Sequence, residues 1–76
     1  MKQKFLIEAK RMARDAGYHE ARRVGIYKEY SVMEPIFTDG KFHFIGIPQY
    51  ILYKEGKLRW TKDYQESLDI IDAISR

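Results

Sequence analysis

The side chains that could perform acid–base, nucleophilic or metal chemistry are few and scattered along this chain of 76 residues. His19 and His43 are the only histidines, and cysteine is absent. Metal centres need three or four ligands, and the positive charge of nearby Lys41 would repel a metal held by His43. The three serines lack a glycine-rich elbow, and the five glycines are dispersed rather than gathered into a phosphate-binding loop. We therefore predict no catalytic residue, metal or cofactor, and no small-molecule substrate, so the protein is expected not to be an enzyme.

Seven residues are better candidates for binding a macromolecule, because together they combine positive charge with aromatic and apolar side chains. Lysine and arginine attract phosphates and acidic groups, tyrosine can stack on a base, and leucine adds an apolar contact. These candidate binding residues are Lys41, His43, Tyr50, Leu52, Lys54, Lys57 and Arg59. They can act together only if the elements that carry them are strands of one sheet.

Two short turns organise the strand-like region, which begins at Val24 and ends at Thr61. Asp39-Gly40 and Glu55-Gly56 each separate β-branched and aromatic runs by two residues, which is the spacing of a tight hairpin. Cross-strand partners share a face, so the hairpins predict a buried face of Phe37, Phe42, Phe44, Ile51, Tyr53, Leu58 and Trp60. The opposite face then carries the candidate binding residues, and we expect it to be open to solvent.

The positions on the buried face change parity along this region, which a regular strand cannot do. Phe44 is even-numbered whereas Ile51 is odd-numbered, so a break is predicted at 46–48, where glycine and proline occur. A similar mismatch predicts a second break at 29–32. Each break is either a bulge within one strand or a reversal of the chain, so the sheet has three to five strands.

An amphipathic helix is predicted over residues 3–16, before the strand-like region. Its apolar residues recur at spacings of three and four, at Phe5, Ala9, Met12, Ala13 and Ala16. Gly17 follows directly and suits the left-handed position that ends a helix. Residues 18–23 show no clear period and are interpreted as a connection.

A second helix is predicted over residues 63–75, with Asp63 as its N-cap and Glu66 at the reciprocal position of a capping box. Its buried stripe is expected to consist of Tyr64, Leu68, Ile71 and Ile74, with Ile70 beside it. The pattern therefore predicts an α+β fold in which both helices pack on one face of an antiparallel sheet. At this length, residues 1–76 are expected to form a single small domain.

Charge is distributed unevenly along the chain. Residues 1–30 carry eight basic and four acidic residues, whereas residues 31–76 carry six basic and seven acidic residues. The absence of cysteine, of a signal peptide and of a long apolar segment favours a cytoplasmic protein that does not enter a membrane. We expect a non-catalytic binding module whose open sheet face contacts a protein partner or a second copy. The alternative is binding of RNA or single-stranded DNA through the basic patch.

Overall fold

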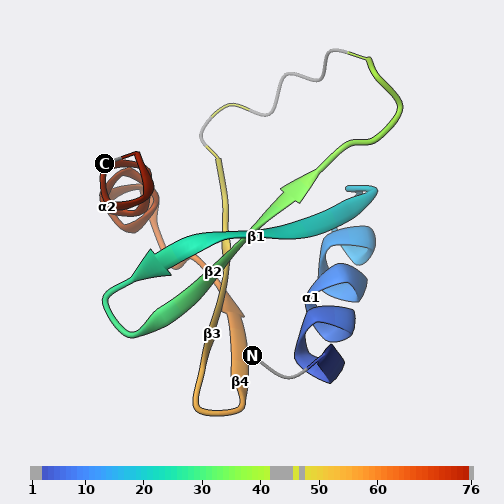
Figure 1. Ribbon diagram of the computed structural model, residues 1–76. Coiled ribbons are helices and arrows are strands. Elements are labelled where there is room, and N and C mark those ends of the chain that lie inside the picture. The colour runs from blue at the N-terminus through green and yellow to red at the C-terminus, as the bar shows by residue number, and fades with distance from the viewer. Residues whose placement is uncertain (1–2, 42–45, 47, 76) are drawn as a thin grey trace.

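The elements follow the order helix, four antiparallel strands, helix in the computed structural model, which describes residues 3–41, 46 and 48–75 (Figure 1). Their bounds are α1 (Gln3–Asp15), β1 (Glu20–Tyr27), β2 (Tyr30–Ile36), β3 (Ile51–Lys54), β4 (Lys57–Trp60) and α2 (Tyr64–Ile74). The strands lie in the sequence order β1-β2-β3-β4, and each runs antiparallel to its neighbours. This arrangement confirms the predicted α+β class, the order of the elements and an antiparallel sheet within the predicted range of strand number.

Helix α1 ends as the sequence predicts, at a glycine. Gly17 has a φ of +96°, and its N–H donates to the carbonyl of Arg14 at 3.0 Å while the N–H of Tyr18 donates to that of Ala13 at 2.9 Å. This pair of bonds is the Schellman motif, which satisfies the last carbonyls of a helix. Ala9 and Ala13 are fully buried, whereas Ala16 lies beyond the helix and is exposed, which corrects its predicted place in the core.

Strand β1 begins at Glu20, so the interpretation of residues 18–23 as a connection is wrong. The pairing of β1 with β2 shifts between Arg23 and Gly25, which places a bulge at Val24. Within residues 20–23 only Ala21 is buried, whereas Arg22 and Arg23 are both exposed, and for that reason the segment shows no strand period. The break predicted at 29–32 is a reversal one residue earlier, because Tyr27 pairs with Tyr30 across a two-residue turn at 28–29.

The turn between β3 and β4 is the predicted tight hairpin. Lys54 pairs with Lys57, and the two residues between them have positive φ angles, +52° at Glu55 and +82° at Gly56. Positive φ at both central residues is the geometry whose twist matches that of paired strands.

The turn predicted at Asp39-Gly40 lies in a long connection between β2 and β3. Asp39 Oδ1 accepts a hydrogen bond from the N–H of Lys41 at 3.1 Å, and neither residue belongs to a strand. Phe42, Phe44 and Ile45, on which that hairpin depends, lie outside the described residues, as does Ile47 of the break predicted at 46–48.

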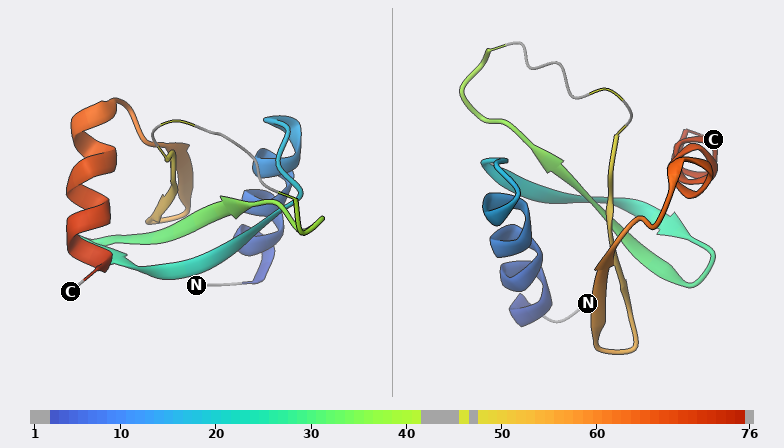
Figure 2. Two further views of the ribbon diagram at one scale, coloured as in Figure 1. Left: turned by 90° about the horizontal axis from the view of Figure 1, so that it is seen from above. Right: turned by 180° about the vertical axis from the view of Figure 1, so that it is seen from behind.

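The two helices contact the sheet through separate apolar clusters on its opposite faces. Val32 and Met33 are consecutive in β2 and fully buried, yet Val32 packs in a cluster with Ile70 of α2 and Met33 packs in one with Ala9 of α1. Successive strand residues point to opposite faces. Seen from above, α1 and α2 accordingly flank the β3–β4 hairpin (Figure 2). The expectation that both helices share one face is therefore corrected.

Helix α2 is also turned relative to its predicted stripe. Ile70 is fully buried and Ser67 is 2% exposed, whereas Tyr64 is 57% exposed and Leu68 is 36% exposed. The prediction failed because the most apolar stripe was assumed to face the sheet, whereas the buried side of the helix also carries the polar residues Glu66 and Ser67.

Candidate functional site

The predicted open face of the sheet is largely covered by α2. Leu52 is fully buried and Tyr50 is 3% exposed, and both pack in the cluster that contains Ile70. Burial among apolar groups, together with the negative charge of Glu34, raises the pKa of the Tyr50 phenol. These two residues are core residues, so their predicted role as surface contacts is corrected.

The remaining candidates are divided between two regions of the chain. Lys41 is exposed in the connection after β2, and His43 lies outside the described residues. Lys54, Lys57 and Arg59 lie together on the β3–β4 hairpin, where Lys57 pairs with Lys54 and Arg59 pairs with Leu52. The structure therefore brings together three of the seven predicted residues.

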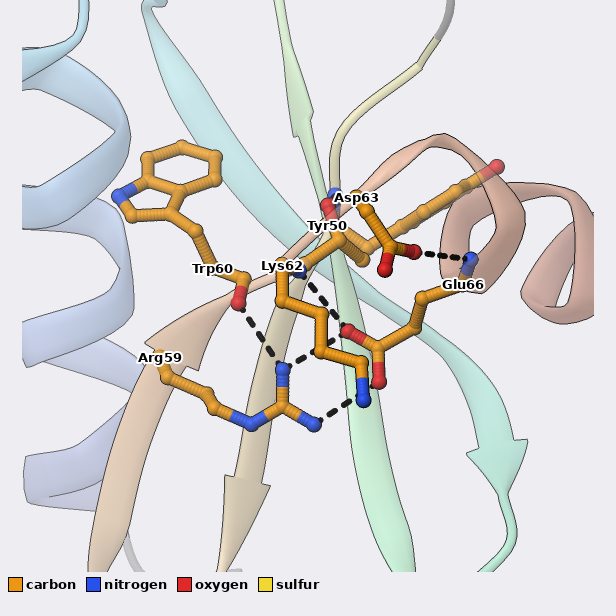
Figure 3. A network of polar contacts seen from close by, with 7 residues as sticks. Tyr50, Arg59, Trp60, Lys62, Asp63 and Glu66 are labelled. Atoms are coloured by element: carbon orange, nitrogen blue, oxygen red, sulfur yellow. Dashed lines mark hydrogen bonds and ion pairs between the residues drawn. The ribbon is translucent and has the colours of Figure 1, made fainter.

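Arg59 joins β4 to the start of α2 (Figure 3). Its two terminal nitrogens donate to the two carboxylate oxygens of Glu66 at 2.8 and 2.9 Å, and one of them also donates to the Trp60 carbonyl at 3.1 Å. Glu66 is only 8% exposed, and the hydrogen bonds from Arg59 hold its pKa at about 2, below the ordinary value of 4.5. The same pairing raises the pKa of Arg59. A bidentate pair of this kind fixes geometry as well as charge.

The capping arrangement at α2 matches the prediction in one half. Asp63 Oδ1 accepts from the Glu66 N–H at 2.9 Å, as an N-cap should. The Glu66 side chain accepts instead from the Lys62 N–H, one residue before the cap, at 2.9 Å. The reciprocal half of the predicted capping box is therefore replaced by the bond from Lys62, and the same carboxylate anchors Arg59.

Lys54 and Arg59 both lie beside the ring of Tyr30, the first residue of β2. The Lys54 Nζ is 5.5 Å from the ring centre and the Arg59 Cζ is 4.8 Å from it. Lys54 also pairs with Glu29 at 2.9 Å, which raises the pKa of Lys54 and lowers that of Glu29. A hydrogen bond and the positive charge of Arg59 lower the pKa of the Tyr30 phenol.

Two adjoining depressions surround these side chains, and we call them together the basic surface. One has a volume of about 440 Å³ and is lined by Tyr27, Lys28, Glu29, Tyr30, Lys54, Arg59, Lys62 and Glu66. The other, of about 370 Å³, is lined by Tyr30, Lys54, Glu55, Lys57, Leu58 and Arg59, and it extends to β4. Their linings hold five cationic side chains and three carboxylates.

A groove of different character lies on the opposite side of β4, where α1 faces the hairpin. It has a volume of about 550 Å³ and is lined by Lys4, Phe5, Glu8, Met12, Gly56 and Leu58, which together define the α1–β4 groove. The Phe5 ring packs 4.6 Å from that of Tyr53, and Leu58 is only partly buried. The sequence predicts Leu58 on the buried face. The side chain remains partly accessible because α1 leaves a groove beside it, and the sequence pattern does not predict the position of α1.

The backbone of β4 forms one edge of the sheet. The Thr61 N–H donates to the Tyr50 carbonyl at 2.9 Å, and hydrogen-bonded pairs alternate along antiparallel strands. The bonded pairs are therefore Leu52–Arg59 and Lys54–Lys57, so the N–H and C=O of Leu58 and Trp60 point away from β3. The Trp60 carbonyl is held by Arg59. Within the described part of the chain, the N–H and C=O of Leu58 have no hydrogen-bond partner.

The histidine that the structure describes takes part in a local contact. The Nδ1 of His19 accepts a hydrogen bond from the N–H of Thr38 at 3.0 Å, and its ring packs edge-on against Phe37. Across residues 3–41, 46 and 48–75, no three His, Asp or Glu side chains gather into a group that could hold a metal ion. Neither of the two helices found there has the length and apolar character needed to span a membrane.

Comparisons with the models of protein families, with curated proteins and with solved structures find no match for this chain.

Proposed function

We propose that this chain is a non-catalytic binding module that holds a protein partner at the edge of β4 and in the α1–β4 groove. The observation that carries the proposal is the unpaired N–H and C=O of Leu58 beside an apolar groove. A sheet edge offers backbone hydrogen bonds to another chain, and an adjacent apolar groove offers side-chain contacts. The two features together favour a polypeptide as the bound molecule.

The composition of the groove supports the same proposal. Phe5 and Met12 of α1 and Leu58 of β4 supply its apolar surface, while Lys4 and Glu8 stand among them as charged residues. Glu8 is already paired with Arg11 at 2.9 Å. Apolar and aromatic side chains bordered by charged ones are typical of surfaces that bind proteins.

Nucleic-acid binding through the basic surface is the second candidate, favoured by the cations gathered around Tyr30. Two observations weaken it. Lys54 and Arg59 already hold the carboxylates of Glu29 and Glu66, which reduces the charge that they can offer to phosphate. The same two cations lie beside the Tyr30 ring, on which a base would have to stack.

A peptide-display experiment tests the leading proposal. Peptides selected from a random library on the wild-type chain should bind it in purified form and should lose most of their affinity for Leu58→Ser. The matched control is Leu68→Ser, which removes a partly exposed leucine from α2, away from the groove. Circular dichroism should show that both variants remain folded.

Two results would overturn the proposal. One is a library that yields no peptide above background, and the other is a set of peptides that binds Leu58→Ser as tightly as the wild type. A labelled single-stranded RNA whose affinity falls steeply with added salt and is lost in a Lys57→Glu, Lys62→Glu double variant would support the second candidate instead.

A further inference from the structure

From the two sides of β4 we infer how the partner binds and what its chemistry is: an extended segment adds to β4 as a fifth strand, and its residues alternate between apolar and acidic. This inference rests on the proposed function, since it describes the occupant of the same edge and groove. It specifies how the partner binds, the sequence pattern of the bound segment and the sign of its charge. Each of these three parts can be tested separately.

The side chains of β4 point alternately to two different environments. Leu58 pairs with Tyr53 on the face towards α1, where it lines the α1–β4 groove, and it also borders the basic surface. Lys57 and Arg59 pair with Lys54 and Leu52 on the opposite face and line the basic surface alone. Seen from behind, β4 lies between α1 and α2 (Figure 2). Cross-strand neighbours share a face, so every second residue of an added strand would enter the groove and the residues between them would face the cations.

The charges of β4 and its surroundings select an acidic segment. The basic surface holds Lys28, Lys54, Lys57, Arg59 and Lys62 against Glu29, Glu55 and Glu66, an excess of two positive charges. Because Lys54 and Arg59 are already paired with carboxylates, the exposed Lys57 is the cation best placed to meet a residue of the added strand. The groove itself adds no excess of either sign, because its lining holds one cation, Lys4, and one carboxylate, Glu8.

The same charges disfavour a second copy of this chain at β4. If two β4 strands paired edge to edge in antiparallel fashion, the Lys57–Arg59 face of one would lie directly against that of the other. Like charges placed opposite each other across strands destabilise the pairing. The acidic side chains of the added segment would instead lie opposite Lys57 and attract it. Electrostatic complementarity of this kind sets specificity.

The hydrogen bonds of β4 also fix where the added strand is centred. Leu58 can contribute both its N–H and its C=O, whereas the Trp60 carbonyl already accepts from the Arg59 guanidinium. The strongest backbone contacts are therefore expected at Leu58, and its amide should exchange with solvent more slowly when the segment is bound.

Three synthetic peptides of equal length separate the parts of this inference. The first alternates valine and glutamate, the second alternates valine and lysine, and the third is the valine–glutamate peptide with N-methyl groups on alternate backbone nitrogens. Titrations followed by ¹H–¹⁵N correlation spectra should show the first peptide shifting the Leu58 and Trp60 amides. The lysine peptide should bind at least about tenfold more weakly, and the methylated peptide should not bind.

A reversal of charge on the protein provides the complementary measurement. Lys57→Glu should weaken binding of the valine–glutamate peptide by about fivefold, the scale of one exposed charge pair, and should strengthen binding of the lysine peptide. Lys41→Glu is the matched control, because Lys41 is an exposed lysine outside the basic surface, and it should leave both affinities unchanged.

Several outcomes would overturn the inference. Equal affinity for the two charged peptides removes its electrostatic part, and undiminished binding of the methylated peptide removes strand addition. If library-selected peptides bind at Leu58 while the valine–glutamate peptide does not, the inference fails and the proposed function stands. If neither kind of peptide binds, both fail.

Discussion

At the scale of single residues, Glu66 is the side chain whose substitution we expect to lower the free energy of unfolding most. It is nearly buried, it accepts two hydrogen bonds from Arg59 and one from the Lys62 backbone, and its own N–H is capped by Asp63. Removing one partner of such a pair leaves the other desolvated without its counter-charge. The network therefore ties the end of β4 to the first turn of α2.

We expect Glu66→Gln to lower the free energy of unfolding by about 2 kcal/mol, because hydrogen bonds to charged groups are worth more than neutral ones. Urea denaturation measures this difference. Glu8→Gln is the matched control: Glu8 also pairs with an arginine, but at an exposed site, so its loss should cost less than about 0.5 kcal/mol. Equal effects of the two substitutions would show that the buried network has no special role.

The low pKa of Glu66 makes part of the stability dependent on pH. Its pKa is about 2 in the folded chain against an ordinary value of 4.5, so folding favours the ionised carboxylate. The contribution is complete above the unfolded pKa and is lost as the pH falls from 4.5 towards 2. Urea midpoints measured through this range should fall more steeply for the wild type than for Glu66→Gln, and parallel curves would contradict the assignment.

At the scale of elements, the β3–β4 hairpin positions the whole candidate site. Its turn places Glu55 and Gly56 in the left-handed region, which is unfavourable for a side chain such as glutamate. The hairpin therefore forms despite Glu55 rather than because of it, and its register depends on Gly56 and on the cross-strand pairs.

Substitutions in this turn should shift stability in opposite directions. Glu55→Asn should raise the free energy of unfolding by about 0.5 kcal/mol, since asparagine tolerates positive φ, and Gly56→Ala should lower it by about 1 kcal/mol. A Cβ at Gly56 would lie 4.0 Å from Phe5 Cζ, an ordinary contact, so the loss would come from the backbone. Thermal unfolding measures both effects, and two changes of the same sign would contradict this account of the turn.

Most elements could be predicted from the sequence because each has a local signal. Gly17 ends α1, Asp63 begins α2, and Glu55-Gly56 closes the hairpin, and all three depend on neighbours within a few residues. The start of β1 could not be predicted, because Arg22 and Arg23 are both exposed and the alternation by which a strand is recognised is missing there.

The candidate site could be predicted only in part, for a different reason. The hairpin register predicts two sets of residues on opposite faces of the sheet, Lys54, Lys57 and Arg59 on one and Ile51 and Leu58 on the other. The observed pairing confirms this division. What covers each face depends on where α2 packs. Because Leu52 and Tyr50 were assigned to the same side as the lysines, that side was expected to be open, whereas these residues form the core beneath α2.

At the scale of the whole molecule, one pair of central strands serves two cores. Val32 and Met33 of β2, like Leu52 and Ile51 of β3, are neighbours in sequence whose side chains belong to different clusters. Because both clusters are built on β2 and β3, separation of these strands would expose the apolar residues of both clusters at once. We therefore expect the molecule to unfold in a single cooperative transition in spite of its divided core.

The variant Val32→Ala tests this cooperativity. It removes two methyl groups from the cluster under α2, which should lower the free energy of unfolding by about 2 kcal/mol. Trp60, the only tryptophan, packs in the opposite cluster, so its fluorescence reports on the side that was not altered. Its unfolding midpoint should fall together with that of the circular dichroism signal, whereas a Trp60 transition left in place would mean that the two halves unfold independently.

The positive charges on β4 also bear on aggregation, because this strand forms an edge of the sheet. The open edge of a strand that carries leucine and tryptophan is the kind of edge from which amyloid-like fibrils grow, and adjacent lysine and arginine side chains oppose such stacking. A Lys57→Val variant, which leaves the Arg59–Glu66 pair in place, would therefore change more than partner selection. It would remove a charge that opposes stacking at this edge of the sheet, and fibrils would then start to grow from it.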